Sequence, residues 1–410
     1  MKVIFVHYFF TDNGVTRSVL NNIKGLKQIS PDFEFALVAD SFSSQFPDYV
    51  EERFIDWNSD QLIESLEILT KDADAVVIEN PVVGMFPKAT LAFKNFAERN
   101  EDKNIIYRVH DLVDDRPHLF EKFFEVFQDK DSIYPRTDNV TFITLTESDK
   151  RRLEEKGLSN VRVLPNSVIV SDLVSSKEKS EEFRKFLEEK KIVLSGEKIL
   201  FYPVRIEKRK NVEEALLITK ILNNLEENYR LVVTLPYLGD YEMSLKKLAA
   251  DFEIPCSIGE AGKFIGFDKN KGFTTGEMFA ISDLAITTSV REGFGFAYVE
   301  PWISETPLIG RKIPEITADF ESNGIDLRHL YDNSLFPVTE NFEERILLIR
   351  SILSDHVKLK ELAGKLGLKK MIKTASLLAE SNSKKAAEKY GHVNVARQLL
   401  SYMTVPKCIN

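Results

Sequence analysis

The chain has 410 residues, 43% of them hydrophobic, which is enough for two or three domains with full-sized cores. A net charge of −9 and a pI of about 5.5 argue against nucleic acid or an anionic membrane as the main partner. The two cysteines, Cys256 and Cys408, lack metal-ligand spacing and favour a reducing compartment. The N-terminal apolar run is too short for a signal peptide, and no run approaches the roughly 18 apolar residues of a membrane span. We therefore expect a soluble, cytoplasmic protein.

The N-terminal half alternates between apolar runs and helical patterns. Residues 2–9 predict a buried strand, residues 11–14 break it, and a helix with apolar residues at helical spacing follows. Further strands are predicted at residues 33–39, 75–78, 105–109, 141–145 and 161–164, with helices at residues 60–69 and 87–97. This order predicts a doubly wound domain, in which helices cover both faces of a parallel sheet. The first loop has a single glycine, Gly14, so a dinucleotide-binding fingerprint is not indicated.

His110 and Asp111 stand directly after the strand predicted at residues 105–109. In open α/β sheets ligands gather at the carboxyl ends of the strands, which makes His110 a candidate for binding or catalysis. The alternative is a structural histidine that satisfies a loop carbonyl. Asp72 and Asp74 have the spacing of a metal-binding pair, but no further ligand accompanies them, so we expect a turn there and no metal site.

A charged helix predicted at residues 177–191 leads into a second domain. The first strand of that domain is expected at residues 198–205, followed by a short loop and a helix that starts at Val212. Arg205 and Lys210 lie five positions apart across this loop. Two cations beside a helix N-terminus would neutralise a diphosphate, with the arginine as a fork and the lysine as a point charge. The alternative is a basic surface turn, because the loop carries further basic residues.

The most specific motif lies in residues 290–301, where Glu292 and Glu300 stand eight positions apart. Between them is a turn made of Gly293, Phe294, Gly295 and Phe296. A strand is predicted before the turn and a helix over residues 297–304 after it, so backbone N–H groups and a helix dipole would suit a phosphate-bearing ligand. The two carboxylates are acceptors suited to sugar hydroxyls rather than to phosphate. The alternative is a surface loop with two solvated glutamates.

Together these motifs resemble the retaining glycosyltransferases of family four, and the resemblance spans essentially the whole chain. It implies the GT-B architecture, an α/β fold in which two Rossmann-like, doubly wound domains face a cleft. On this resemblance, residues 1–172 form the N-terminal domain on the acceptor side. Residues 173–385 form the domain that binds the nucleotide-sugar donor, and residues 386–410 form a C-terminal helix that packs back on the first domain.

The resemblance also implies roles for individual residues. Glu292 contacts the donor sugar, and Glu300 holds the nucleotide ribose. The predicted catalytic residues are His110 near the donor sugar, Glu292, and the diphosphate-binding residues Arg205 and Lys210. The remaining predicted donor contacts are Gly14, Phe264 near the nucleotide base, Gly293, Phe294, Gly295 and Phe296, and the predicted acceptor contacts are Arg17, Asp111 and Arg311. Many relatives have a longer segment with paired glycines where this chain has Gly310, Arg311 and Lys312, which indicates a change of acceptor or sugar recognition.

We therefore expect a metal-independent, retaining hexosyltransferase. It would move a hexose from a UDP- or GDP-linked sugar to a hydroxyl of a small soluble acceptor, with the nucleotide sugar as substrate and no cofactor. An epimerase or a phosphorylase of the same fold is an alternative, although a pyridoxal-phosphate lysine pattern is not identified. A catalytically silent, sugar-nucleotide-binding partner is another. The sequence does not indicate the base, the sugar, the acceptor or the oligomeric state.

Overall fold

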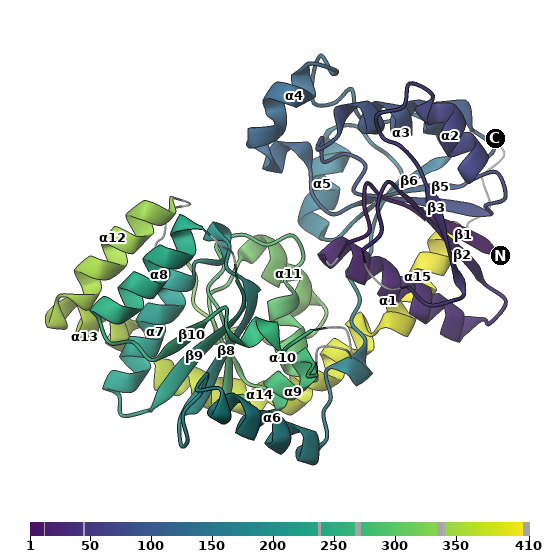
Figure 1. The fold of residues 1–410 in the computed structure, drawn as a ribbon. Coiled ribbons are helices and arrows are strands. Elements are labelled where there is room, and N and C mark those ends of the chain that lie inside the picture. Colours follow the sequence, from purple (N-terminus) through teal and green to yellow (C-terminus); the bar gives the residue numbers. More distant parts are fainter. Residues whose placement is uncertain are drawn as a thin grey trace. The chain divides into compact units, whose positions relative to one another are not determined.

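The computed structural model describes residues 1–11, 13–43, 46–236, 239–266, 272–333, 339 and 341–404. The chain divides into two compact units, the first made of Met1–Val168 with Tyr390–Asn410 and the second of Ile169–Lys389. Each unit is built on one parallel sheet with helices around it (Figure 1). Within the described ranges, no helix is both long and apolar enough to cross a membrane. Of the two cysteines, Cys256 is a free thiol and Cys408 lies outside the described residues.

The described part of the first unit has seven parallel strands in the order β3-β2-β1-β4-β5-β6-β7. These strands are β1 (Lys2–Val6), β2 (Glu34–Ala39), β3 (Val50–Phe54), β4 (Ala75–Glu79), β5 (Ile105–Val109), β6 (Val140–Thr144) and β7 (Val161–Val163). The helices are α1 (Gly14–Ile29), α2 (Leu62–Leu69), α3 (Pro87–Arg99), α4 (Phe120–Phe124), α5 (Glu147–Glu155) and α15 (His392–Met403). Because the strands are parallel, their carboxyl ends meet at one edge of the sheet, and His110 lies there, directly after β5.

The central strand β1 shows why helices cover both faces of this sheet. Ile4 and Val6 pack into a core that includes residues of α2 and α3. Val3 and Phe5 pack into a second core with residues of α1 and α15. Successive side chains of a strand point to opposite faces, so an unbroken apolar run is buried on both sides. The doubly wound arrangement predicted from the sequence is confirmed.

The last helix, α15, packs against α1 in the first unit (Figure 1). A Cβ added to Gly25 of α1 would lie 2.5 Å from the carbonyl oxygen of His392 and 2.7 Å from the Cβ of Ala396. Only glycine allows two helices to approach this closely. The chain therefore returns to the first unit after α14 (Leu368–Tyr390), as the resemblance implied.

The described part of the second unit has five parallel strands in the order β10-β9-β8-β11-β12. These strands are β8 (Lys198–Arg205), β9 (Tyr229–Leu235), β10 (Cys256–Ile258), β11 (Leu284–Thr287) and β12 (Leu308–Gly310). The helices besides α14 are α6 (Lys177–Glu189), α7 (Val212–Asn224), α8 (Asp240–Asp251), α9 (Thr275–Ala280), α10 (Glu300–Ile303), α11 (Pro314–Ser322), α12 (Phe342–Leu353) and α13 (His356–Leu366). The central strand β8 and its neighbour β11 lead into the loops that carry Lys210 and Glu292.

The prediction of one continuous helix over residues 297–304 is wrong, because the structure has two shorter elements there. The chain makes a 3-10 turn, Phe296–Tyr298, followed by the single-turn helix α10. Pro301 lacks the N–H that a continuous α-helix would bond to the carbonyl of residue 297, so α10 begins anew at Glu300. A helix of four residues aligns few peptide dipoles, and its attraction for an anion is correspondingly small. A phosphate at this turn would therefore depend mainly on side-chain cations.

Candidate active site

Lys210 and Glu292 form a nearly buried ion pair in the second unit. Lys210 ends the 3-10 turn Lys208–Lys210 that follows β8, and Glu292 lies in the loop after β11. The Nζ of Lys210 lies 2.6 and 2.7 Å from the two carboxylate oxygens of Glu292. The Ser289 hydroxyl donates to the same carboxylate at 2.6 Å, and Arg209 donates to it at 2.9 Å. The structure thus brings together the cation predicted for the diphosphate and the carboxylate predicted for the sugar.

Burial and neighbouring charges set the protonation of this pair. Burial alone would raise the pKa of Glu292, but the charges of Lys210 and Arg209 and the hydrogen bonds from Lys210 and Ser289 lower it to about 2. Burial lowers the pKa of Lys210 from its ordinary value, and the charge of Glu292 opposes that shift. At neutral pH Glu292 is therefore a carboxylate that only accepts hydrogen bonds, which suits sugar hydroxyls.

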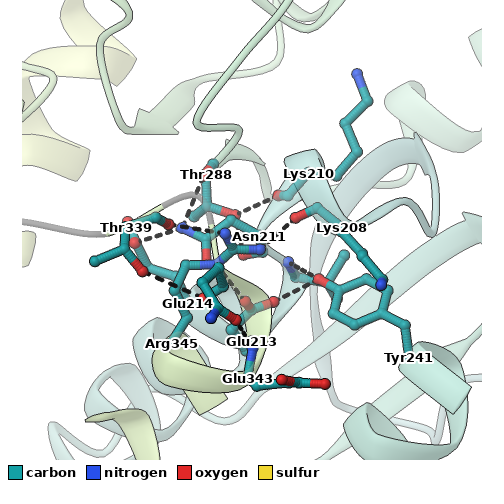
Figure 2. A network of polar contacts seen from close by, with 12 residues as sticks. Lys208, Lys210, Asn211, Glu213, Glu214, Tyr241, Thr288, Thr339, Glu343 and Arg345 are labelled. Atoms are coloured by element: carbon teal, nitrogen blue, oxygen red, sulfur yellow. Dashed lines mark hydrogen bonds and ion pairs between the residues drawn. The ribbon is translucent and has the colours of Figure 1, made fainter. Parts of the chain in front are cut away.

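The backbone that carries Lys210 is held by a network of polar side chains (Figure 2). Arg345 on α12 donates to the carbonyl of Lys208, and Thr288 donates to the carbonyl of Asn211 at 2.8 Å. Asn211 adopts a left-handed backbone with φ of 51°, which asparagine tolerates better than most residues. The side chain of Lys210 points away from the network (Figure 2). These contacts fix the backbone of the loop, and the hydrogen bonds with Glu292 hold the ammonium of Lys210.

Two consecutive glutamates on the first turn of α7 anchor this network. The Oε1 of Glu213 lies 2.6 Å from the Nε of Arg345, and the Oε2 of Glu214 lies 2.8 Å from the Nη2 of Arg311. All four side chains are at most 1% exposed. Arg311 is a predicted acceptor contact, but its guanidinium makes three hydrogen-bond contacts with Glu214. This geometry favours a structural role for Arg311, and its contact with the acceptor stays a prediction.

The turn between the two predicted glutamates is held by its aromatic residues. Gly295 has a left-handed φ of 87°, and a Cβ there would lie 2.8 Å from the ring of Tyr298. Phe294 is buried, and its ring packs edge-on against Phe296 at 5.1 Å and Phe320 at 5.5 Å. These contacts hold the turn that directly follows Glu292.

The other predicted donor contacts of the second unit have different surroundings. Arg205 is the last residue of β8, and its side chain is exposed at the carboxyl edge of the sheet. Glu300 begins α10 and is buried. Phe264 follows a short 3-10 turn and is half-buried, with its ring edge-on to Phe186 at 4.9 Å. Of these residues, Arg205 is the one that presents a charge to solvent.

In the first unit, His110 contacts a carboxylate that the sequence reasoning missed. The Nε2 of His110 lies 2.5 Å from the Oε2 of Glu79, which is the last residue of β4. Asp111 follows on the same loop and pairs with Arg116 at 3.0 Å. Glu79 has the same sequence signal as His110, a polar residue at the end of an apolar strand, and could have been found by it.

The predicted phosphate-side loop of the first unit opens α1 at Gly14. The side chain of Asn13 caps this helix and accepts hydrogen bonds from the N–H groups of Val15 and Thr16, at 2.9 and 3.0 Å. Arg17 lies half-buried in the first turn. The N-terminus of α1 is therefore already capped by the protein, and Arg17 is the positively charged residue of its first turn.

Part of the sequence matches a known protein family. Residues 183–366 match the family described as glycosyl transferases group 1, a range that contains Arg205, Lys210, Glu292 and Glu300. This part of the chain therefore resembles the group 1 glycosyltransferases. A curated relative of this chain is mannosylglucosyl-3-phosphoglycerate synthase of Petrotoga mobilis, with 29% identity over 374 residues that cover 83% of this chain and 72% of the relative.

Two further proteins resemble this chain. Mannosylglucosylglycerate synthase of Petrotoga mobilis is 21% identical over 326 residues, which cover 73% of this chain and 72% of that protein. The crystal structure of HepE from Anabaena in complex with UDP and glucose matches with a TM-score of 0.65 and 14% identity, over 98% of this chain and 99% of that chain. At this level of identity the likeness shows the shared GT-B fold.

Proposed function

We propose that this chain is a retaining hexosyltransferase, which moves a hexose from a nucleoside-diphosphate sugar to a hydroxyl of a small soluble acceptor in the cytoplasm. The observation that carries the proposal is the Lys210–Glu292 pair at the carboxyl edge of β8 and β11, within the part of the chain that matches the family. A fixed cation beside a fixed carboxylate matches a ligand that joins a phosphate to a sugar.

The chemical step places negative charge on the departing diphosphate. Lys210 and Arg205 would stabilise that charge, and a donor of positive charge that is already in position needs no reorganisation when the bond breaks. Glu292 would orient the sugar through its hydroxyls, and Glu300 would hold the ribose. Since Lys210 is bonded to Glu292 in the structure, donor binding would share or exchange these contacts.

Retention follows from attack on the same face of the sugar. The oxygen of the acceptor hydroxyl forms a bond to the anomeric carbon as the bond from that carbon to the diphosphate oxygen breaks. The departing phosphate oxygen takes the proton of the acceptor hydroxyl, so no protein carboxylate is needed as nucleophile or base. His110 is proposed to contact the sugar near this carbon. The charge on the diphosphate is met by protein cations, so no metal ion is part of the proposed step.

The names of the relatives narrow the proposed substrates. Both curated relatives are named as synthases of mannosylglucosyl compounds, one of a 3-phosphoglycerate and one of a glycerate. We propose a mannosyl group as the hexose and a small anionic glycoside as the acceptor. Such an acceptor needs a local cation on a chain of net charge −9, and Arg17 is the candidate in the first unit.

We expect one of UDP, GDP and ADP, or its sugar conjugates, to raise the melting temperature of the chain without added metal. A ligand at 100 times its Kd stabilises the folded state by about 2.7 kcal/mol, and the stabilising nucleotide names the base. The measurement is a thermal-shift panel on the full chain, followed by an acceptor screen with that donor. A folded sample that responds to none of them would contradict donor binding.

A second expected result concerns Arg345, which supports the loop of Lys210 from α12. Replacement by lysine keeps the charge beside Glu213 but loses the fork that also bonds the carbonyls of Lys208 and Thr339. We expect Arg345→Lys to weaken binding of the identified nucleotide by about tenfold, which corresponds to roughly one lost hydrogen bond of about 1.4 kcal/mol. Titration calorimetry measures this.

The matched control for Arg345→Lys is Arg350→Lys on the same helix. Arg350 pairs with Asp251 at 2.6 Å on the surface, and we expect its replacement to leave nucleotide binding unchanged. Equal Kd values for the parent chain and Arg345→Lys would show that the network of Figure 2 does not act on the nucleotide site.

A further inference from the structure

A fully buried carboxylate holds the ring of His110. Glu79 ends β4 and His110 directly follows β5, and these parallel strands are neighbours in the sheet, with Glu79 opposite Arg108. Both side chains therefore stand at the same carboxyl edge. The Oε2 of Glu79 lies 2.5 Å from the Nε2 of His110, and the side chain of Glu79 is 0% exposed. This contact is short and shielded from water, which strengthens it.

The residue after Glu79 holds the backbone of His110. The Oδ1 of Asn80 accepts hydrogen bonds from the N–H groups of His110, at 3.3 Å, and Asp111, at 3.0 Å. Asn80 adopts a left-handed backbone with φ of 57°, a conformation that asparagine tolerates. Glu79 and Asn80 thus bind His110 at both its ring and its main chain. Two consecutive residues at the end of the neighbouring strand β4 therefore fix the position of the imidazole.

The contact with Glu79 decides which ring nitrogen of His110 faces a ligand. A carboxylate can only accept, so the proton of a neutral ring is on Nε2. The Nδ1 of His110 has no hydrogen-bond partner among the residues that the structure describes, and 8% of the residue stays exposed. In the neutral ring Nδ1 carries a lone pair. It is the atom that remains to accept a hydrogen bond from a hydroxyl group.

Arg108 and His7 also contact Glu79. The Nε of Arg108, which is fully buried, lies 3.9 Å from the Oε2 of Glu79. His7 contacts the backbone carbonyl of Glu79 at 3.0 Å, and burial lowers the pKa of His7 to about 4, so this ring is neutral at pH 7. Asp111 faces Asn80 and Arg116 rather than the ring.

Stability alone does not explain a carboxylate at this place. The Oε1 of Glu79 has no hydrogen-bond partner although it is buried, and such an atom opposes folding. The two residues before it on β4, Val77 and Ile78, are fully buried and apolar, and an apolar residue at position 79 would avoid that loss. Buried polar groups kept against this loss are candidates for a functional role.

We propose that Glu79 is a positioning residue, which fixes the proton of His110 on Nε2 and presents Nδ1 to a hydroxyl of the transferred hexose. This inference rests on the proposed function for the identity of the ligand. Glu79 does not touch the sugar and acts only through His110. Its removal should therefore change the tautomer of His110 as well as the rate of transfer.

The tautomer is tested on the full chain without any ligand. Nitrogen-15 NMR of the histidine rings, with His110 assigned by comparison with His110→Ala, distinguishes a protonated from an unprotonated nitrogen. We expect a protonated Nε2 and an unprotonated Nδ1 at pH 8, and a mixture of tautomers in Glu79→Gln, whose amide can both donate and accept. A protonated Nδ1 in the parent chain would overturn the proposal whether or not the chain transfers a sugar.

The coupling to transfer is tested by a double-mutant cycle. We expect Glu79→Gln to lower kcat/KM by about 10- to 100-fold, because one hydrogen bond to a charged group is lost. In the His110→Ala background, the same change should have no further effect on kcat/KM. Equal losses in both backgrounds would show a merely structural role. The control, Glu98→Gln, removes a surface partner of Lys94 on α3 and should change nothing. If Glu79→Gln fails to fold, Glu79→Asp keeps the charge but shortens the reach to Nε2.

The ligand is tested with GDP-mannose and UDP-glucose against GDP and UDP alone. We expect the Nδ1 resonance of His110 to shift with a nucleotide sugar and not with its nucleotide. A shift with the nucleotide alone would overturn the assignment of the hexose hydroxyl. Binding of neither sugar nucleotide would contradict the proposed function, while the tautomer measurement would still decide the role of Glu79.

Discussion

We expect replacement of either Glu292 or Lys210 by alanine to remove most of the proposed transfer activity while the chain stays folded. Lys210 would stabilise the charge of the departing diphosphate, and Glu292 would orient the sugar and hold Lys210 in place. Removing one preorganised group that acts on developing charge typically lowers the rate by about 100- to 1,000-fold. The measurement is kcat/KM for transfer from the nucleotide sugar identified by thermal shift, with circular dichroism to show that the fold is kept.

A matched surface pair serves as the control for these variants. Lys198 begins β8, the strand that leads to the loop of Lys210, and pairs with Glu227 at 2.5 Å. We expect Lys198→Ala to keep near-normal activity, since a pair exposed to solvent contributes little. Glu292→Gln keeps the shape of the side chain and separates loss of charge from loss of packing. Near-normal turnover in both Glu292→Ala and Lys210→Ala would refute the site.

The sheets could be predicted because their strands are buried on both faces. Residues 105–109 and 198–205 are apolar runs that stand out from their charged surroundings, and the structure has strands over the same residues. Carboxyl ends of parallel strands meet at one edge, which also made His110 and the loop after residue 205 visible as candidates. Burial on both faces requires unbroken apolar runs, and these predictions depend on such runs.

The edge strand β3 could not be predicted for the opposite reason. Its sequence is Val50-Glu-Glu-Arg-Phe54, and most of its side chains face solvent. Arg53 pairs with Glu51 on the same strand and with Asp72 at 2.8 Å. Asp72 was recognised as part of a turn, and the ion pair with Arg53 gives it a structural role. An edge strand held by surface ion pairs has no apolar period, so nothing in its pattern distinguishes it from a loop.

Contacts between distant residues were the other limit. Lys210 and Glu292 were predicted to bind different parts of a ligand, but their bond to each other joins loops 82 positions apart in the sequence. The pairing of Glu79 with His110 is equally non-local, 31 positions apart. A single sequence shows which residues can carry charge or accept hydrogen bonds. It does not show which of them the strand order places side by side.

Arg311 is the residue whose predicted role changes most once its surroundings are known. In the sequence it stands beside a second cation, Lys312, yet its side chain is 1% exposed and bonded to Glu214. Glu214 also accepts from the Tyr331 hydroxyl at 2.5 Å and from the Asn211 amide at 2.6 Å. Because Asn211 precedes α7 and follows Lys210, this buried cluster connects the last strand to the loop of the ion pair.

We expect Arg311→Met to destabilise the second unit by about 3–5 kcal/mol, because it leaves the Glu214 carboxylate buried without its cation. For a domain of this size that is a fall in melting temperature of roughly 10 °C. Adding Glu214→Leu should restore most of the loss, since two apolar side chains can replace a buried pair. The control is Arg328→Met. Arg328 is 76% exposed and pairs with Asp326, so we expect its replacement to change the melting temperature little.

The same variants decide between the two roles of Arg311. If Arg311 is structural, the stability of Arg311→Met falls, and the double variant recovers both stability and the KM for the acceptor. If Arg311 binds the acceptor, the double variant recovers stability while its KM for the acceptor stays high, because the guanidinium is still missing. Burial of the guanidinium against Glu214 favours the first outcome. An unchanged melting temperature in Arg311→Met would show that the buried pair does not support the fold, and would return Arg311 to the acceptor site.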